Sequence, residues 1–200
     1  MKIEDLQPLC HDWAGRGLNQ PFIQQGKIYA TNGKWCIRMD RTEDFTTDNV
    51  SEINVVQHST IEWDNFDIVT SWITITDIPR DKAFGQCDKC GGSGMVANCG
   101  ECDGTGEVEC EYGHTHTCPE CDGDGIETDG TKQDSCDKCD STGLKRSENK
   151  INIGNNNFYI WQLYELMLVL GKLEFPRHEA FAVIPFKFDG GQGLIMHVRI

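Results

Sequence analysis

The chain has 200 residues, of which 25% are charged, and its formal net charge is −14 at pH 7. This length suffices for one ordinary domain plus an appendage. No apolar run approaches the roughly 20 residues that a membrane-spanning helix needs, and no positively charged, cleavable apolar leader opens the chain. We therefore expect a soluble, cytoplasmic protein.

The segment before the first cysteine pair is predicted to combine one helix with several strands. Apolar residues at helical spacing predict an amphipathic helix over residues 3–14, which Gly15 and Gly17 end. The Asn32-Gly33 dipeptide between two β-prone runs is a strong hairpin signal. Strands are predicted at 27–31, 34–39, 50–58, 60–63 and 71–78.

The stretch from Cys87 to Gly143 repeats one phrase four times: C-D-K-C-G-G-S-G, C-G-E-C-D-G-T-G, C-P-E-C-D-G-D-G and C-D-K-C-D-S-T-G. Two cysteines at this spacing can grip one metal ion from a tight turn, and a tetrahedral zinc ion needs two such turns. The glycines let the backbone fold back and aim N–H groups at the sulfurs. Four turns therefore predict two closed, structural zinc sites. The expected ligands are Cys87, Cys90, Cys99, Cys102, Cys118, Cys121, Cys136 and Cys139.

Two other uses of paired cysteines fit the pattern less well. A disulfide framework requires an oxidising compartment. A thioredoxin-like dithiol requires one C-x-x-C at the start of a helix, in a strand–helix unit, and four glycine-rich copies do not provide it. Catalysis of thiol exchange by the C-x-x-C turns is the enzymatic alternative. We find no catalytic arrangement, however, and expect a protein that is not an enzyme.

The cysteine-rich stretch is acidic and lacks large apolar residues. It holds 14 acidic and three basic side chains, which oppose direct nucleic-acid binding because that depends on Lys and Arg. Zinc, at about 10 kcal/mol or more per site, would supply the stability that burial cannot. The acidic surface either keeps this segment soluble or attracts a basic protein surface.

Five further residues carry groups that can bind metals or react. Cys110, His114 and His116 lie between the second and third copies and are candidates for a further metal site, although a full ligand set is not evident. Cys10 and Cys36 lie in apolar patterns and are expected to be buried core thiols.

After the cysteine-rich stretch, the pattern returns to that of a globular domain. A short strand is predicted at 151–153, a helix at 158–170 that ends at Gly171, and two closing strands at 180–188 and 194–200. The outer chain is therefore predicted to be α+β, with an antiparallel sheet and two helices interrupted by the zinc insertion.

The four C-x-x-C-x-G-x-G copies resemble the cysteine-rich zinc module of DnaJ-type co-chaperones, although Ser141 replaces one glycine and no His-Pro-Asp tripeptide is present. The resemblance implies such a module over residues 85–145. In that family the first and fourth motifs share one zinc ion, and the second and third share the other. This implies one ion bound by Cys87, Cys90, Cys136 and Cys139, and a second ion bound by Cys99, Cys102, Cys118 and Cys121.

Three outer segments resemble bacterial DNA polymerase sliding clamps: I-Y-A-T-N-G-K-W-C-I-R-M from Ile28, F-Y-I-W-Q-L-Y-E-L-M-L-V-L from Phe158, and G-L-I-M-H-V-R-I from Gly193. The resemblance implies one clamp-like domain, residues 1–84 and 146–200, similar to small phage-encoded clamp-like proteins with a zinc arm. In the family the terminal residues help form a peptide pocket; Met196, Val198 and Ile200 occupy those positions here, or else serve as core residues of a closing strand.

Together these resemblances imply a non-catalytic, zinc-binding interaction protein whose acidic arm contacts a replication or host protein. One alternative is an oligomeric sliding clamp, which would need six such domains to encircle DNA. Another is chaperone-like binding of unfolded protein by the zinc module.

Overall fold

The chain folds into two compact units. One comprises Met1–Ala83 together with Ser147–Ile200, and the other comprises Phe84–Arg146. The first unit is thus discontinuous in sequence, because the second is inserted into it. In this computed structural model, the described residues are 3–11, 19–24, 26–40, 63, 65–127 and 134–196.

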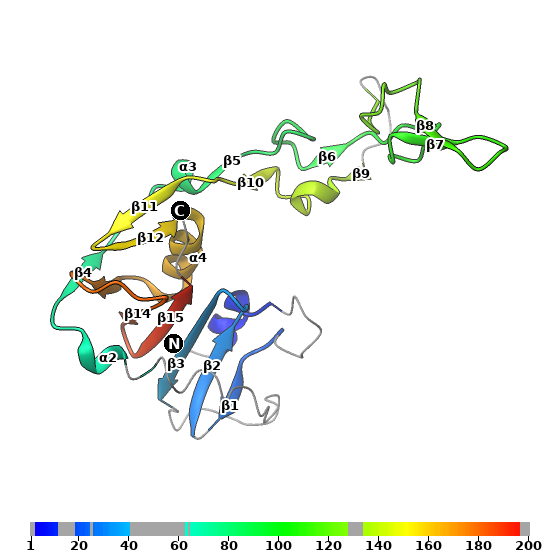
Figure 1. The fold of residues 1–200 in the computed structure, drawn as a ribbon. Coiled ribbons are helices and arrows are strands. Elements are labelled where there is room, and N and C mark those ends of the chain that lie inside the picture. Colours follow the sequence, from blue (N-terminus) through cyan, green and yellow to red (C-terminus); the bar gives the residue numbers. More distant parts are fainter. Residues whose placement is uncertain are drawn as a thin grey trace. The chain divides into compact units, whose positions relative to one another are not determined.

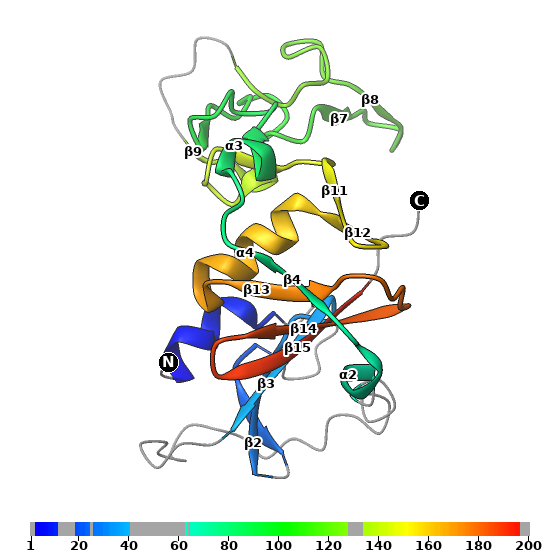
Figure 2. The same cartoon turned by 90° about the vertical axis from the view of Figure 1, so that its left-hand side faces the viewer.

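The first unit is built on a seven-stranded antiparallel sheet with the order β1-β2-β3-β15-β14-β13-β4 (Figure 1; Figure 2). Strands from before and after the insertion meet at its centre, where β15 pairs with β3 and Leu194 lies opposite Cys36. The strands are β1 (Phe22–Gln24), β2 (Lys27–Thr31), β3 (Trp35–Asp40), β4 (Trp72–Ile75), β13 (Leu173–Pro176), β14 (Val183–Phe188) and β15 (Gly191–Met196). The expected antiparallel sheet is therefore present.

The hairpin predicted at Asn32-Gly33 joins β2 to β3. The Asn32 side-chain oxygen accepts the backbone N–H groups of Lys34 at 2.9 Å and Trp35 at 3.1 Å. Gly33 has a φ of 80°, a conformation that costs glycine least. The local sequence thus sets this turn, and the turn sets the register of the two strands.

Aromatic rings and one amphipathic helix fill the core of the first unit. Helix α4 (Ile160–Leu170) buries Leu163 and Leu166. The ring centroids of Phe158 and Phe175 lie 4.8 Å apart. On the sheet, Gly193 pairs with Phe186. A Cβ atom on Gly193 would lie 2.0 Å from the Phe186 ring, so the absence of a side chain makes room for that ring.

Near the N-terminus, the predicted α-helix over residues 3–14 is wrong in type and length. A 3₁₀ helix, η1, spans Ile3–Leu9 and contains Pro8. Proline has no N–H to donate to the preceding turn, and it disfavours helical continuation. Residues 12–14 of the prediction lie outside the described part of the chain.

Several strand and helix bounds also differ from the prediction because tertiary pairing decides them. Asn156–Tyr159 forms strand β12 and pairs with β11 (Lys150–Ile153), so helix α4 starts at Ile160 rather than at 158. Strand β13 was not predicted. It is only four residues long and ends at Pro176, and a proline makes a segment look less like a strand in the sequence.

Elsewhere, the predicted strands over 50–58 and 60–62 fall outside the described residues. Trp63 is helical rather than extended, and two short helices, α2 (Asn65–Ile68) and α3 (Arg80–Ala83), were not predicted. No helix within the described part of the chain has the length and apolarity to cross a membrane.

The second unit consists of nested two-stranded ladders with almost no apolar core. Its entering and leaving segments pair antiparallel, as β5 with β10, then β6 with β9, and finally as the hairpin β7–β8. Its two buried clusters consist mainly of cysteines. The bounds are β5 (Phe84–Gln86), β6 (Met95–Val96), β7 (Glu107–Glu109), β8 (Thr115–Thr117), β9 (Asp134–Ser135), η2 (Asp137–Cys139) and β10 (Leu144–Arg146).

Candidate metal centre

The eight repeat cysteines gather into two sets of four in the second unit. Within each set the sulfur atoms all lie within 4.8 Å of one another. We call the set formed by the first and fourth motifs the outer set and the set formed by the second and third motifs the inner set. The outer set is Cys87, Cys90, Cys136 and Cys139, and the inner set is Cys99, Cys102, Cys118 and Cys121.

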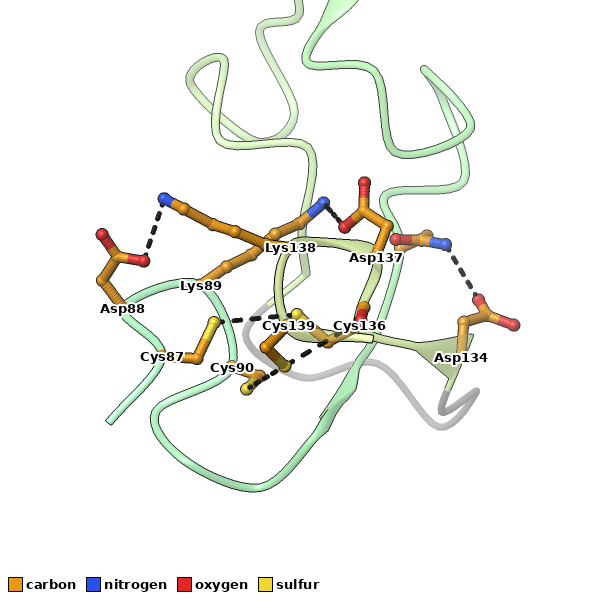
Figure 3. A network of polar contacts seen from close by, with 10 residues as sticks. Cys87, Asp88, Lys89, Cys90, Asp134, Cys136, Asp137, Lys138 and Cys139 are labelled. Atoms are coloured by element: carbon orange, nitrogen blue, oxygen red, sulfur yellow. Dashed lines mark hydrogen bonds and ion pairs between the residues drawn. The ribbon is translucent and has the colours of Figure 1, made fainter. Parts of the chain in front are cut away.

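The spacing of the sulfurs suits a tetrahedral metal ion. Four sulfurs that each lie about 2.3 Å from a central zinc ion are about 3.8 Å apart, whereas bonded disulfide sulfurs are about 2.05 Å apart. All eleven cysteines of the chain are free thiols. In the outer set the Sγ–Sγ distances are 3.9 Å for Cys87–Cys136 and 3.7 Å for Cys90–Cys139, and Figure 3 shows these four cysteines. In the inner set they are 3.8 Å for Cys99–Cys118 and 3.7 Å for Cys102–Cys121.

The last glycine of every motif donates its backbone N–H to the sulfur of that motif's second cysteine. Such hydrogen bonds favour the thiolate form, which is the form that binds metal. The donor–sulfur distances are 3.3 Å for Gly94 to Cys90, 3.3 Å for Gly106 to Cys102, 3.2 Å for Gly125 to Cys121 and 3.3 Å for Gly143 to Cys139.

The same glycines join the motifs in pairs. Each accepts, at its carbonyl oxygen, the N–H of the first cysteine of the partner motif, so the bonds are reciprocal within a pair. The distances are 2.9 Å for Cys87 to Gly143, 3.0 Å for Cys136 to Gly94, 3.0 Å for Cys99 to Gly125 and 2.9 Å for Cys118 to Gly106. Each set is therefore a pair of like turns related by a local two-fold arrangement.

The paired turns approach so closely that only glycine fits at these positions. A Cβ atom on Gly143 would lie 2.2 Å from the Gly92 carbonyl oxygen, and one on Gly106 would lie 2.2 Å from that of Gly123. Ser141, which replaces a glycine of the repeat, keeps the left-handed backbone with a φ of 62°. The departure from the repeat thus changes the residue but keeps the conformation of the turn.

Two ion pairs cross between the motifs of the outer set (Figure 3). Lys89 lies 2.8 Å from Asp137, and Lys138 lies 2.9 Å from Asp88. The hydrogen bond from Lys138 lowers the pKa of Asp88 to about 2. The identical Asp-Lys dipeptides of the first and fourth motifs therefore exchange partners, a relationship that the sequence reasoning missed although the repeated D-K was visible.

The thiols within each set differ in how readily they ionise. Burial opposes ionisation of Cys90, but hydrogen bonds from Gly94 and Gly92 outweigh it and lower the pKa to about 6. Burial, helped by the neighbouring thiols, raises the pKa of Cys139 to about 12. The inner set has the same division. Hydrogen bonds outweigh burial at Cys102 and lower its pKa to about 7, whereas burial raises the pKa of Cys99 to about 12. Four adjacent thiolates require a bound cation to balance their charge.

An open groove of about 910 Å³ also lies in the second unit. Residues adjacent to both cysteine sets line it, including the two ion pairs of the outer set. Near the inner set the groove is lined by Asp103 and Asp124, and its one large apolar lining residue, Ile126, packs against the outer set. All 13 described carboxylates between Cys87 and Gly143 are exposed, so the groove opens within an acidic surface.

The other candidate residues from the sequence lie away from the two sets. Cys10 and Cys36, which were expected to be buried, are half-buried, and burial still raises the pKa of Cys10 to about 11 and of Cys36 to about 12. Met196 is 54% exposed at the end of β15, and the other two pocket candidates, Val198 and Ile200, lie outside the described residues. Cys110 is close to the tip of the β7–β8 hairpin, where hydrogen bonds from the Tyr112 and His114 backbone lower its pKa.

Comparison with known proteins identifies no relative: no protein-family model, no curated protein and no solved structure matches the chain.

Proposed function

We propose that both cysteine sets bind zinc and that the second unit is a zinc-stabilised arm. Four thiolates in a tetrahedron are the donor set of structural zinc sites, which leave no position open for water. With two such ions, the eight thiolates keep a charge of about −4 in the arm. Native mass spectrometry of the purified chain tests this directly, since two zinc ions per chain are expected and none, or another metal, would contradict it.

We further propose that the arm is a non-catalytic interaction module that receives a basic segment of a protein partner. The observation that carries this proposal is the groove between the two cysteine sets. Its lysines, Lys89 and Lys138, already pair with Asp137 and Asp88, which leaves Asp103 and Asp124 to set the charge of the inner end. Complementary charge favours encounter with a basic surface and selects against an acidic one.

A peptide rich in Lys and Arg is a suitable probe for the full, zinc-loaded chain. Asp103→Asn with Asp124→Asn removes two charges from the groove, while Glu120→Gln with Asp122→Asn removes two exposed charges outside its lining. Asp103 and Asp122 follow the second cysteine of their motifs, and each has a φ of 49°, so the two variants are closely matched. The groove variant should weaken binding at least several-fold more than its control. Equal weakening would mean that the acidic surface acts only through net charge and solubility.

For the first unit, we propose a single clamp-like domain, and we propose a replication or host protein as the partner of the arm. The support is that two of the three segments resembling clamps, those from Ile28 and Gly193, meet in one sheet, where β3 and β15 pair directly. Helix α4 contains no Lys or Arg over Ile160–Leu170, a poor surface for sliding along phosphates. An interaction protein is therefore favoured over a DNA-encircling ring.

Light scattering after size-exclusion chromatography separates these two roles. A six-domain ring requires a hexamer of this chain, whereas an interaction module functions as a monomer or a dimer. A hexamer that retains duplex DNA at physiological salt would overturn the interaction proposal. Capture of a purified replication clamp or polymerase by the wild-type chain, with loss in the groove variant, would support it.

A further inference from the structure

The β7–β8 hairpin presents three metal-binding side chains on one face. Val108 pairs with His116 and Glu109 pairs with Thr115, and the backbone N–H of Cys110 donates to the carbonyl oxygen of His114 at 2.9 Å. Side chains alternate between the faces of a strand, and directly paired residues share a face. Val108 and His116 therefore share one face, and Glu109 and Thr115 share the other. Cys110 and His114 follow the strand ends directly, and continuing the alternation through their backbone hydrogen bond places both on the face of Val108 and His116.

The backbone around Cys110 also repeats that of a ligand turn. At Cys90, the N–H groups two and four residues later, Gly92 and Gly94, hydrogen-bond the sulfur, and the N–H three residues later donates to the Cys90 carbonyl oxygen at 3.1 Å. At Cys110, hydrogen bonds from the backbone two and four residues later, at Tyr112 and His114, lower the pKa of the thiol. The N–H three residues later, that of Gly113, donates to the Cys110 carbonyl oxygen at 2.9 Å.

We propose that Cys110, His114 and His116 form a third metal site, for a divalent ion of the zinc class, with three protein ligands and one open position. Thiolate and imidazole are the donors that zinc prefers, and three protein ligands leave the fourth position to water. On binding, Cys110 releases its proton to solvent, and both histidines bind as neutral imidazoles.

Unlike the two cysteine sets, this third site is not preformed. Among the described residues, only the two cysteine sets have their ligand atoms gathered within 4.8 Å. The hairpin site closes by rotation of side chains, since His114 and His116 are exposed. Ordering exposed side chains costs conformational entropy, so the third ion binds more weakly than the first two and leaves first when a mild chelator is added.

Zinc titration of the full chain, followed by native mass spectrometry, tests the proposal. The wild-type chain should bind a third zinc ion after the two cysteine sets are filled. His114→Ala with His116→Ala, and separately Cys110→Ser, should lose that ion and retain the other two. Thr115→Ala with Thr117→Ala changes the opposite face of the same hairpin and should retain all three.

A stop at two ions in the wild type, or a third ion that persists in the histidine variant, would overturn the site. NMR of the wild-type imidazoles gives a second readout that does not depend on variant folding. The signals of His114 and His116 should shift with the third equivalent of zinc, while the His178 signal should stay in place. Unchanged signals for both hairpin histidines would also reject the proposal.

Discussion

Gly94 lies so close to Ser141 that a Cβ atom on Gly94 would stand 2.2 Å from the Ser141 carbonyl oxygen. Gly94 also has a φ of 77° and donates its N–H to the Cys90 sulfur at 3.3 Å. Gly94, where the first motif meets the fourth, therefore has no room for a side chain, has a left-handed backbone conformation and donates a hydrogen bond to a cysteine sulfur. A side chain here must push the two motifs apart and separate Cys90 from Cys139.

We therefore expect Gly94→Ala to lose the metal ion of the outer set and to keep that of the inner set. Gly91→Ala is the matched control, because Gly91 also has a positive φ, 59°, but a Cβ atom there meets nothing within 4 Å. The control bears only the conformational cost, of about 1 kcal/mol. Native mass spectrometry of both variants gives the ion count, and identical counts would refute the steric argument.

The crossed ion pairs lead to a charge-reversal prediction. Lys89→Asp places a negative charge beside Asp137, and Asp137→Lys places a positive charge beside Lys89, so each single change should weaken zinc binding by the outer set. The loss should stay below about tenfold because exposed ion pairs contribute little. The double reversal restores opposite charges and should recover the affinity in a chelator competition. If the double variant bound zinc as weakly as the weaker of the two single variants, the ion pair between Lys89 and Asp137 would not couple the two motifs.

Two metal sites of four cysteines each could be predicted because their signal is local. Every ligand pair lies three positions apart, and the glycine that serves its sulfur follows four positions after the second cysteine. The bonds that join the motifs are not local: Cys87 and Gly143 meet across more than fifty positions of sequence, and spacing alone does not reveal their reciprocity. The exchange between Lys89 and Asp137 was missed for the same reason.

The first unit shows the same division between local and long-range information. The Asn32-Gly33 turn carries its own hydrogen bonds and was predicted correctly. Pro176 concealed β13, which exists because β14 and β4 pair on either side of it. Pro8 was overlooked as a reason for the short N-terminal 3₁₀ helix. Local sequence therefore predicted the structure correctly where a segment makes its own hydrogen bonds. It did not predict a strand that forms only because distant strands pair with it.

Thiol reactivity should single out one cysteine in a chain loaded with two equivalents of zinc. Eight thiols are metal ligands in our proposal, and burial raises the pKa of Cys10 and Cys36 to about 11 and 12, so few of these molecules carry the reactive thiolate at pH 7. The pKa of Cys110 is lowered by backbone hydrogen bonds. A chromogenic disulfide reagent should therefore report one fast thiol, absent in Cys110→Ser. Any fast thiol that remains in that variant would contradict the assignment.

Removal of metal should unfold the arm and leave the first unit intact. The buried clusters of the arm consist mainly of its cysteines, so little apolar burial remains without the ions. All five tryptophans lie outside residues 84–146, and their fluorescence therefore reports the first unit alone. A strong chelator should collapse the dispersed NMR signals of the arm while tryptophan emission stays constant. Retention of arm dispersion without metal would contradict zinc-dependent folding.

Acid should also release the metal, because protons compete with it for the same sulfurs. Burial raises the pKa of Cys99 and Cys139 to about 12, so both favour the protonated form at neutral pH and depend on the ion to stay ionised. At Cys90, backbone hydrogen bonds overcome burial and lower the pKa to about 6, so this sulfur takes a proton only under acidic conditions. Zinc affinity should consequently rise with pH and fall on acidification.

The decline should be steep between pH 7 and pH 4, since several protons replace each ion. Zinc released into a chromogenic indicator measures it, and neutralisation with added zinc should restore occupancy together with the NMR signals of the arm. Tryptophan emission again separates this event from unfolding of the first unit, which contains none of the eight cysteines. If occupancy stayed constant to pH 4, the sulfurs would not be the metal ligands, because thiolate coordination cannot escape competition from protons over that range.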